Sequence, residues 1–167
     1  GRTPEPGQVA ECTRRKTALV IDAYATAVVP VPGSIERIGE LHAAGVPLAV
    51  CSGGLTAEIV AASRRLGVLD CFAAIVSADD VAEHKPHPAG YRRAMTLLGE
   101  RTGRRIRPNR TLAVEDSPAG IDAARAAGLR VLALRTSYSD GQLTAADRLA
   151  DHLAAVTAAD LADIVRA

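Results

Sequence analysis

The chain has 167 residues, of which 48% are hydrophobic and 23% charged, with 20 Lys and Arg against 19 Asp and Glu. This length and composition indicate one globular domain with its own core and exclude a disordered chain. Because the formal net charge is only +1, the chain as a whole has no basic field for nucleic acid or a membrane surface. No apolar run is long enough to span a bilayer. The chain has three cysteines, Cys12, Cys51 and Cys71, an odd number at unpatterned spacings. We therefore expect no disulfide framework, no zinc site and a cytoplasmic location.

Near its start, the chain carries a stretch, ALVIDAYATAVVPVPG, that admits two interpretations. The apolar run Leu19–Ile21 is typical of a strand, and Asp22 would then lie at its carboxyl end. The same stretch also has helical spacing, with a set of apolar side chains along one side: Ala18, Ile21, Ala25 and Val28. The local pattern leaves both interpretations open.

From Ser34 onward, the pattern predicts alternating helices and strands. The predicted order is a helix from Ser34 to Gly45, strand 46–51, helix 55–67, strand 73–76, helix 87–103, strand 111–114, helix 117–128 and strand 130–134, with two short segments in the tail. The strands are apolar without polar alternation, and a helix separates each from the next. This pattern predicts an α/β fold whose parallel sheet is covered by helices on both faces.

Polar residues follow three of the predicted strands. Ser52 and Gly53 come after the first, Lys85 lies a few residues beyond the second, and Glu115–Asp116 end the third. In a parallel sheet, ligands bind beyond the carboxyl ends of the strands, so we expect these residues to meet at one edge. A hydroxyl, backbone amides beside glycine, an ammonium group and two carboxylates together suit a phosphate group with a divalent cation.

Each of these elements has a specific chemical rationale. Ser52 and the N–H of Gly53 are suited to donate to phosphate oxygens at the start of the next helix. Lys85 is flanked by prolines that stiffen its backbone, and its ammonium would reduce the repulsion between phosphate and a carboxylate. Two adjacent acids at the end of a buried strand need a compensating cation, and oxygen ligands suit Mg²⁺, so Glu115 and Asp116 are the predicted metal ligands.

Together these segments resemble the haloacid dehalogenase (HAD) superfamily, in its phosphatase and β-phosphoglucomutase-like branch. The stretch PVPGSIERIGELHAAGVPLAVCSGGLTAEI is similar to the region that ends in the second motif of that family, with Ser52 as the phosphate-binding hydroxyl. IVSADDVAEHKPHPAGYRRAM resembles the third motif, with Lys85, and LAVEDSPAGIDAARAAGLRVLAL the fourth, with Glu115 and Asp116. The order and spacing of the motifs make the resemblance specific.

The resemblance implies a Rossmann-like core and Mg²⁺-dependent phosphoryl transfer through an aspartyl-phosphate. In that family the nucleophile lies in a first motif, D-x-D-G-T, whose strand is central, between the strands of the second and fourth motifs. Here Asp22 is followed by Tyr24 in place of the second aspartate. Loss of that strand would leave unpaired backbone groups in the middle of the sheet.

The upstream residues favour the helical interpretation of Asp22. Arg15–Lys16 and Pro32–Gly33 match the last helix of the cap domain that capped members insert after the first motif. We therefore predict that residues 1–30 are the C-terminal helix of a truncated cap, with a degenerate first strand as the alternative, and that residues 31–167 are the HAD-like core. A missing N-terminal segment would then supply the nucleophile.

The resulting prediction is a Mg²⁺-dependent phosphatase of a small phosphorylated metabolite, with a sugar phosphate as the expected substrate. Ser52 and Lys85 are the candidate catalytic residues, and Ser52, Gly53 and Lys85 would bind the phosphoryl group. Two alternatives remain: a phosphosugar mutase of the β-phosphoglucomutase type, and a catalytically dead phosphate-binding or scaffold protein. Neither nucleic acid nor membrane is an expected partner.

Overall fold

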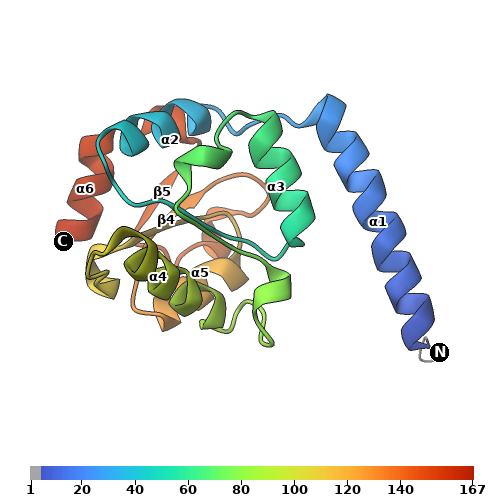
Figure 1. Cartoon of the computed structure of the whole chain (residues 1–167). Coiled ribbons are helices and arrows are strands. Elements are labelled where there is room, and N and C mark those ends of the chain that lie inside the picture. Colours follow the sequence, from blue (N-terminus) through green and yellow to red (C-terminus); the bar gives the residue numbers. More distant parts are fainter. Residues whose placement is uncertain (1–4) are drawn as a thin grey trace.

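The computed structural model describes residues 5–167 and contains alternating helices and parallel strands (Figure 1). The helices are α1 (Pro6–Ala27), α2 (Ser34–Ala43), α3 (Thr56–Arg65), α4 (Ala89–Thr102), α5 (Pro118–Ala126) and α6 (Ala158–Arg166). The strands are β1 (Ala49–Cys51), β2 (Ala74–Val76), β3 (Leu112–Glu115), β4 (Arg130–Leu134) and β5 (Arg148–Ala150). The predicted α/β class and the element order through β4 are confirmed, and the tail supplies a fifth strand and a helix.

The strands are parallel, as predicted, and they form two separate sheets. β1 pairs with β2, and β4 lies between β3 and β5. Within residues 5–167, β1 and β3 therefore each have one edge without a strand partner. Val114 of β3 is 43% exposed although it lies in a strand of the core. We call the space between the open edges of β1 and β3 the gap between the two sheets.

Helices cover both faces of the larger sheet. Val131 and Ala133 of β4 pack into one apolar cluster with Ile121 of α5, while Leu132 and Leu134 face a second cluster that includes Leu161 of α6. Figure 1 shows α4 and α5 below the strands, α2 above them and α6 at the left-hand side. Because successive strand residues point to opposite faces and both faces are covered, β4 is apolar at every position from Val131 to Leu134, which explains its lack of polar alternation.

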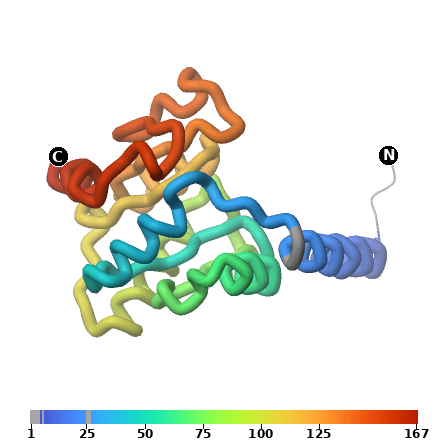
Figure 2. The backbone as a smooth tube through the Cα atoms, turned by 90° about the horizontal axis from the view of Figure 1, so that it is seen from above, coloured from blue at the N-terminus to red at the C-terminus, as the bar shows by residue number. Residues whose placement is uncertain are grey.

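The long helix α1 projects from the side of the molecule and packs along α3 (Figures 1 and 2). Lys16 lies 2.8 Å from Oε1 of Glu58, and the Thr17 hydroxyl donates to the same oxygen at 3.3 Å. The half-buried positions of the middle of the helix recur at helical spacing: Thr17, Val20, Ile21 and Tyr24. The half-buried side of α1 therefore differs from the predicted apolar side, which included Ala18, because Ala18 is exposed.

Asp22 lies on α1 and is exposed, so the strand interpretation of this residue is wrong. The assignment of α1 to a cap domain, and with it the division of the chain at residue 30, stays a prediction. Among the helices of residues 5–167, none combines the length and hydropathy that a transmembrane segment needs.

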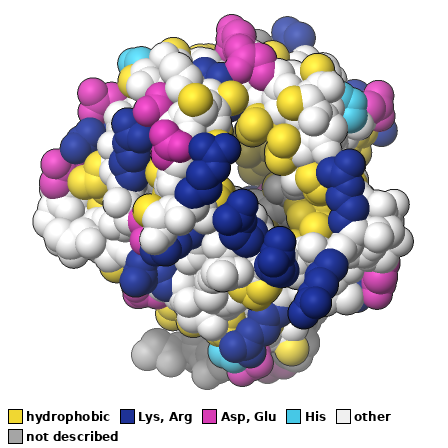
Figure 3. Space-filling model, turned by 90° about the vertical axis from the view of Figure 1, so that its left-hand side faces the viewer, with side chains coloured by type: hydrophobic (Ala, Val, Ile, Leu, Met, Phe, Trp, Pro, Cys, Tyr) yellow, Lys and Arg dark blue, Asp and Glu magenta, His cyan; other side chains and the backbone are white. Residues whose placement is uncertain are grey.

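The near-zero net charge conceals a local excess of arginine. Residues 101–110 contain five arginines and no acid, and Figure 3 shows Lys and Arg side chains gathered on the face that bears this part of the chain. Arg101 donates to the Ala73 carbonyl at 2.8 Å, and Arg104 to the Gly45 carbonyl at 2.7 Å. Because Gly45 and Ala73 precede β1 and β2, these arginines lie at the amino ends of the strands, opposite the edge where ligands bind.

Candidate active site

A cleft of about 450 Å³ opens at the carboxyl ends of β1, β3 and β4 and is lined by residues from both sheets. Its lining includes all five predicted site residues: Ser52, Gly53, Lys85, Glu115 and Asp116. Val31, Cys51, Val114, Ser117, Leu134 and Thr136 complete it. The structure thus brings residues from three motifs into one cleft, as parallel-sheet topology led us to expect, while their individual roles stay predictions.

The turn after β1 presents hydrogen-bond donors to this cleft. The Ser52 N–H donates to the Val76 carbonyl at 2.9 Å, and its hydroxyl oxygen accepts from the Gly54 N–H at 3.1 Å. In the described part of the chain, the Gly53 N–H has no protein acceptor, and a Cβ at this position would meet nothing within 4 Å. The backbone of Gly53 is therefore open to a ligand oxygen.

Lys85 connects the two sheets across the gap. Its ammonium group donates to Oε1 of Glu115 at 2.5 Å, at the end of β3, and to the Cys51 carbonyl at 3.0 Å, at the end of β1. The side chain is only 22% exposed and lies 5.1 Å from the centre of the Tyr91 ring. A fixed cation in this position suits an anion bound between the ends of the two sheets.

The two predicted metal ligands lie in different environments. Glu115 is buried, and its Oε1 also accepts a hydrogen bond from the Tyr91 hydroxyl. Burial, reinforced by the charge of Glu115, raises the pKa of Tyr91, so this phenol stays protonated and donates. Asp116 is exposed in the cleft, and its Oδ2 accepts from the Thr136 hydroxyl at 3.1 Å.

Three residues next to the site have structural roles. Ser117 caps α5 by accepting a hydrogen bond from the Gly120 N–H at 3.1 Å, and Gly120 packs against Glu115. Burial raises the pKa of the Cys51 thiol, which indicates an unreactive side chain at neutral pH.

The sequence analysis missed Tyr91 and Thr136. Tyr91 lies in the predicted helix 87–103, and because a buried tyrosine hydroxyl usually needs a partner, that requirement is the signal that could have found it. Thr136 follows the end of β4, the one predicted strand whose following residues had not been considered.

The donor set fits Mg²⁺ but is incomplete. No group of three or more His, Cys, Asp or Glu side chains suited to a metal occurs among the residues that the structure describes. Oε2 of Glu115 and Oδ1 of Asp116 accept no hydrogen bond in the same region. Since Mg²⁺ takes one or two carboxylates together with water and phosphate oxygens, these two acids suit it if other ligands join them.

Comparison with known proteins extends the resemblance. Protein CbbY of Rhodobacter capsulatus is 36% identical over 95% of this chain and 70% of its own length. Validoxylamine A 7'-phosphate phosphatase of Streptomyces hygroscopicus subsp. limoneus is 35% identical over 78% of this chain and 58% of its own. A crystal structure of a CbbY variant from Rhodobacter sphaeroides in complex with xylulose-(1,5)bisphosphate has a TM-score of 0.84 at 33% identity, covering 95% of this chain and 71% of that one.

The matched relatives are thus longer than this chain. The family model for haloacid dehalogenase-like hydrolases matches residues 4–128, which include all three motifs. The order of the motifs, the α/β fold and the shared cleft agree with that match. The chain belongs to the haloacid dehalogenase-like hydrolase family.

Proposed function

We propose that the cleft binds the phosphoryl group of a small phosphorylated metabolite, with a sugar phosphate as the expected substrate, and that it forms the active site of a Mg²⁺-dependent phosphatase. One observation carries this proposal: the Ser52 turn, Lys85 and the Glu115–Asp116 pair line one cleft between two sheets. Relatives named for validoxylamine A 7'-phosphate, or crystallised with xylulose-(1,5)bisphosphate, support this class of substrate.

In this proposal the Ser52 hydroxyl and the Gly53 N–H donate to phosphoryl oxygens, while the Lys85 ammonium offsets the negative charge of the phosphoryl group. Asp116 and Glu115 would hold Mg²⁺, which supplies further positive charge to the transferring group. These donors are fixed before substrate arrives, because Lys85 is already held by Glu115 and Cys51. Such pre-organisation favours the charge that develops during phosphoryl transfer.

The nucleophile of an aspartyl-phosphate mechanism needs a further carboxylate. Asp22 does not line the cleft, and Glu115 is engaged by Lys85 and Tyr91. We propose that a parallel strand from a further polypeptide segment fits between the open edges of β1 and β3. The carboxyl end of such a strand would lie at the cleft, where an aspartate could attack phosphorus and form the aspartyl-phosphate.

Isothermal titration calorimetry with inorganic phosphate and Mg²⁺ tests the binding step. Because a charge-assisted hydrogen bond contributes about 1.5–3 kcal/mol, Lys85→Met should weaken phosphate binding about 10- to 100-fold. Lys16→Met is the matched control, because Lys16 contacts Glu58 outside the cleft and its loss should leave phosphate affinity unchanged. Equal affinities of the wild-type chain and Lys85→Met would contradict the proposed binding site.

Hydrolysis of p-nitrophenyl phosphate by the chain together with the proposed further strand tests the catalytic step. Turnover should require Mg²⁺ and should be lost in Asp116→Asn. Metal-independent turnover, or full activity of Asp116→Asn, would overturn the assignment.

A binding protein without turnover is the second candidate. It is favoured by one observation, that the cleft holds no carboxylate besides the two predicted metal ligands among the described residues. Phosphate binding without any hydrolysis, even with the proposed further strand present, would support it, whereas turnover would exclude it.

A further inference from the structure

The loop that follows β4 reaches the cleft. Arg135 and Thr136 are its first two residues, and Thr136 contributes to the lining of the cleft. The Thr136 hydroxyl donates to Oδ2 of Asp116 at 3.1 Å. This is the one hydrogen bond that the Asp116 carboxylate accepts within residues 5–167, so it is the contact that sets the rotation of the carboxylate.

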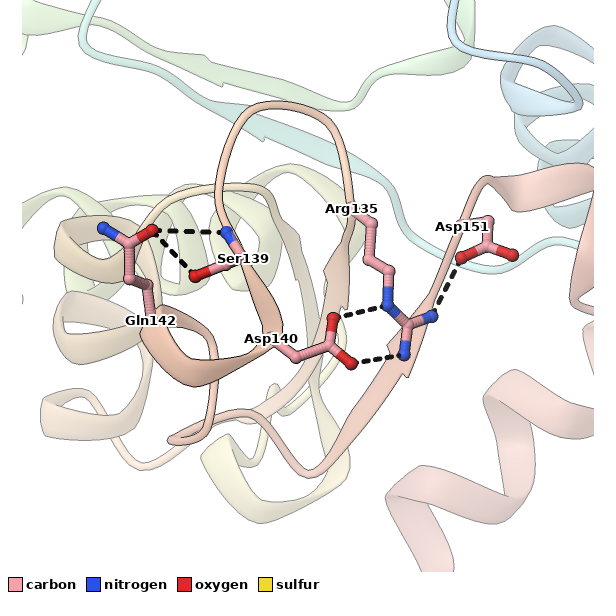
Figure 4. Close-up of polar contacts among 5 residues, drawn as sticks. All are labelled: Arg135, Ser139, Asp140, Gln142 and Asp151. Carbon is pink, nitrogen blue, oxygen red and sulfur yellow. Dashed lines mark hydrogen bonds and ion pairs between the residues drawn. The ribbon is translucent and has the colours of Figure 1, made fainter.

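Arg135 binds two aspartates, Asp140 and Asp151, as Figure 4 shows. Its guanidinium forms a bidentate pair with Asp140 through bonds of 2.6 and 3.1 Å, and it donates to Asp151, just beyond β5, at 2.9 Å. The Arg135 N–H also donates to the Ala150 carbonyl at 2.9 Å. The hydrogen bonds with Arg135 lower the pKa of Asp140, which therefore stays ionised at neutral pH.

A second contact within the loop restrains its far side. Both the N–H and the hydroxyl of Ser139 donate to Oε1 of Gln142, at 3.2 and 3.0 Å (Figure 4). Isolated ion pairs at a surface contribute little to stability. A bidentate guanidinium pair with one carboxylate and a further bond to a second, however, fixes a geometry, because the planar guanidinium group accepts few orientations.

We propose that Thr136 is a positioning residue that holds Asp116 with Oδ1 turned into the cleft for Mg²⁺, and that the Arg135 pairs keep Thr136 in place. This inference rests on the proposed function, since it assumes that Asp116 is a metal ligand. The carboxylate of an exposed aspartate otherwise rotates freely, and the loss of that rotational freedom would oppose metal binding. Groups that orient metal ligands commonly change metal affinity about 10- to 100-fold when they are removed.

Three variants test the role of the Thr136 hydroxyl. Thr136→Val keeps the shape but removes the donor, Thr136→Ala removes the donor with less bulk, and Thr136→Ser restores it. Because Thr136 is exposed, none of the three disturbs the core. Mn²⁺ affinity is measured by electron paramagnetic resonance and Mg²⁺ affinity by competition, with inorganic phosphate affinity measured separately in chelator.

We expect the Val and Ala variants to bind Mn²⁺ and Mg²⁺ about tenfold more weakly and the Ser variant to bind them like the wild type. Phosphate affinity without metal should not change, whereas a general distortion of the cleft would weaken both. Arg135→Lys should weaken metal binding to a smaller degree, because lysine cannot form the bidentate pair. Arg166→Lys alters an exposed pair with Asp163 elsewhere and should have no effect.

The outcomes separate this inference from the proposed function. If the wild type binds Mg²⁺ and Thr136→Val binds it equally well, the positioning role is wrong and the metal site stands. If the wild type binds phosphate but no divalent cation, the metal site and the role of Thr136 both fail.

Discussion

Replacing Gly120 with alanine tests the packing that holds Glu115 in the site. A Cβ at this position would lie 1.9 Å from Oε2, 2.2 Å from Cδ and 2.6 Å from Oε1 of Glu115. Relief of these contacts to an ordinary separation requires the carboxylate to move by roughly 1.5 Å. A glutamate on an exposed surface would simply turn away. Glu115 is buried to 8% exposure and is held by Lys85 and Tyr91, so the movement must break those contacts.

The cost follows from the contacts that are lost. Hydrogen bonds to a charged group contribute about 1.5–3 kcal/mol each, and two of them converge on Oε1 of Glu115. Alanine is favoured over glycine in a helix by about 1 kcal/mol, which offsets part of this loss. We therefore expect Gly120→Ala to lower the free energy of unfolding by about 2–5 kcal/mol, measured by urea denaturation monitored by circular dichroism.

Gly39→Ala provides the matched control. Gly39 lies inside α2, and a Cβ there would meet nothing within 4 Å. The same substitution should therefore stabilise the chain by about 0.5–1 kcal/mol. If Gly120→Ala unfolds at the same or a higher urea concentration than the wild type, Glu115 does not pack against α5 as described, and the reasoning that fixes Lys85 through Glu115 fails with it.

Two further predictions concern buried carboxylates. Tyr91→Phe removes a donor to Glu115 and should destabilise the chain by about 1.5–3 kcal/mol in urea denaturation, whereas Tyr138→Phe, at an exposed tyrosine, should change nothing measurable. Hydrogen bonds from the side chain of Lys16, the Leu55 N–H and the Thr17 hydroxyl lower the pKa of Glu58 from 4.5. This carboxylate therefore stabilises the fold above pH 4.5, and its contribution is lost as pH falls through the lowered pKa. The stability difference between wild type and Glu58→Gln should therefore shrink between pH 5 and pH 3, and a constant difference across that range would contradict the Lys16–Glu58 contact.

The sequence by itself determined the order of the elements and the residues that meet at the cleft. Apolar strands without alternation indicate a parallel sheet, and a parallel sheet brings whatever follows its strands to one edge. The sequence therefore predicts that Ser52, Lys85 and Asp116 lie together, because that prediction needs only the topology and no side-chain geometry. The hydrogen bond by which Ser117 caps α5 is also local, since it joins residues three apart in the chain.

Other features depend on contacts between residues far apart in the chain, and only the tertiary structure decided them. The run from Leu19 to Asp22 fits a strand or a helix locally, and packing of α1 against α3, through Lys16 and Glu58, selects the helix. The division into two sheets, likewise, depends on which strand edges find partners. Adjacent acids cannot be distinguished by sequence, yet Glu115, the last residue of β3, is buried against Lys85, whereas Asp116, just beyond the strand, is exposed in the cleft.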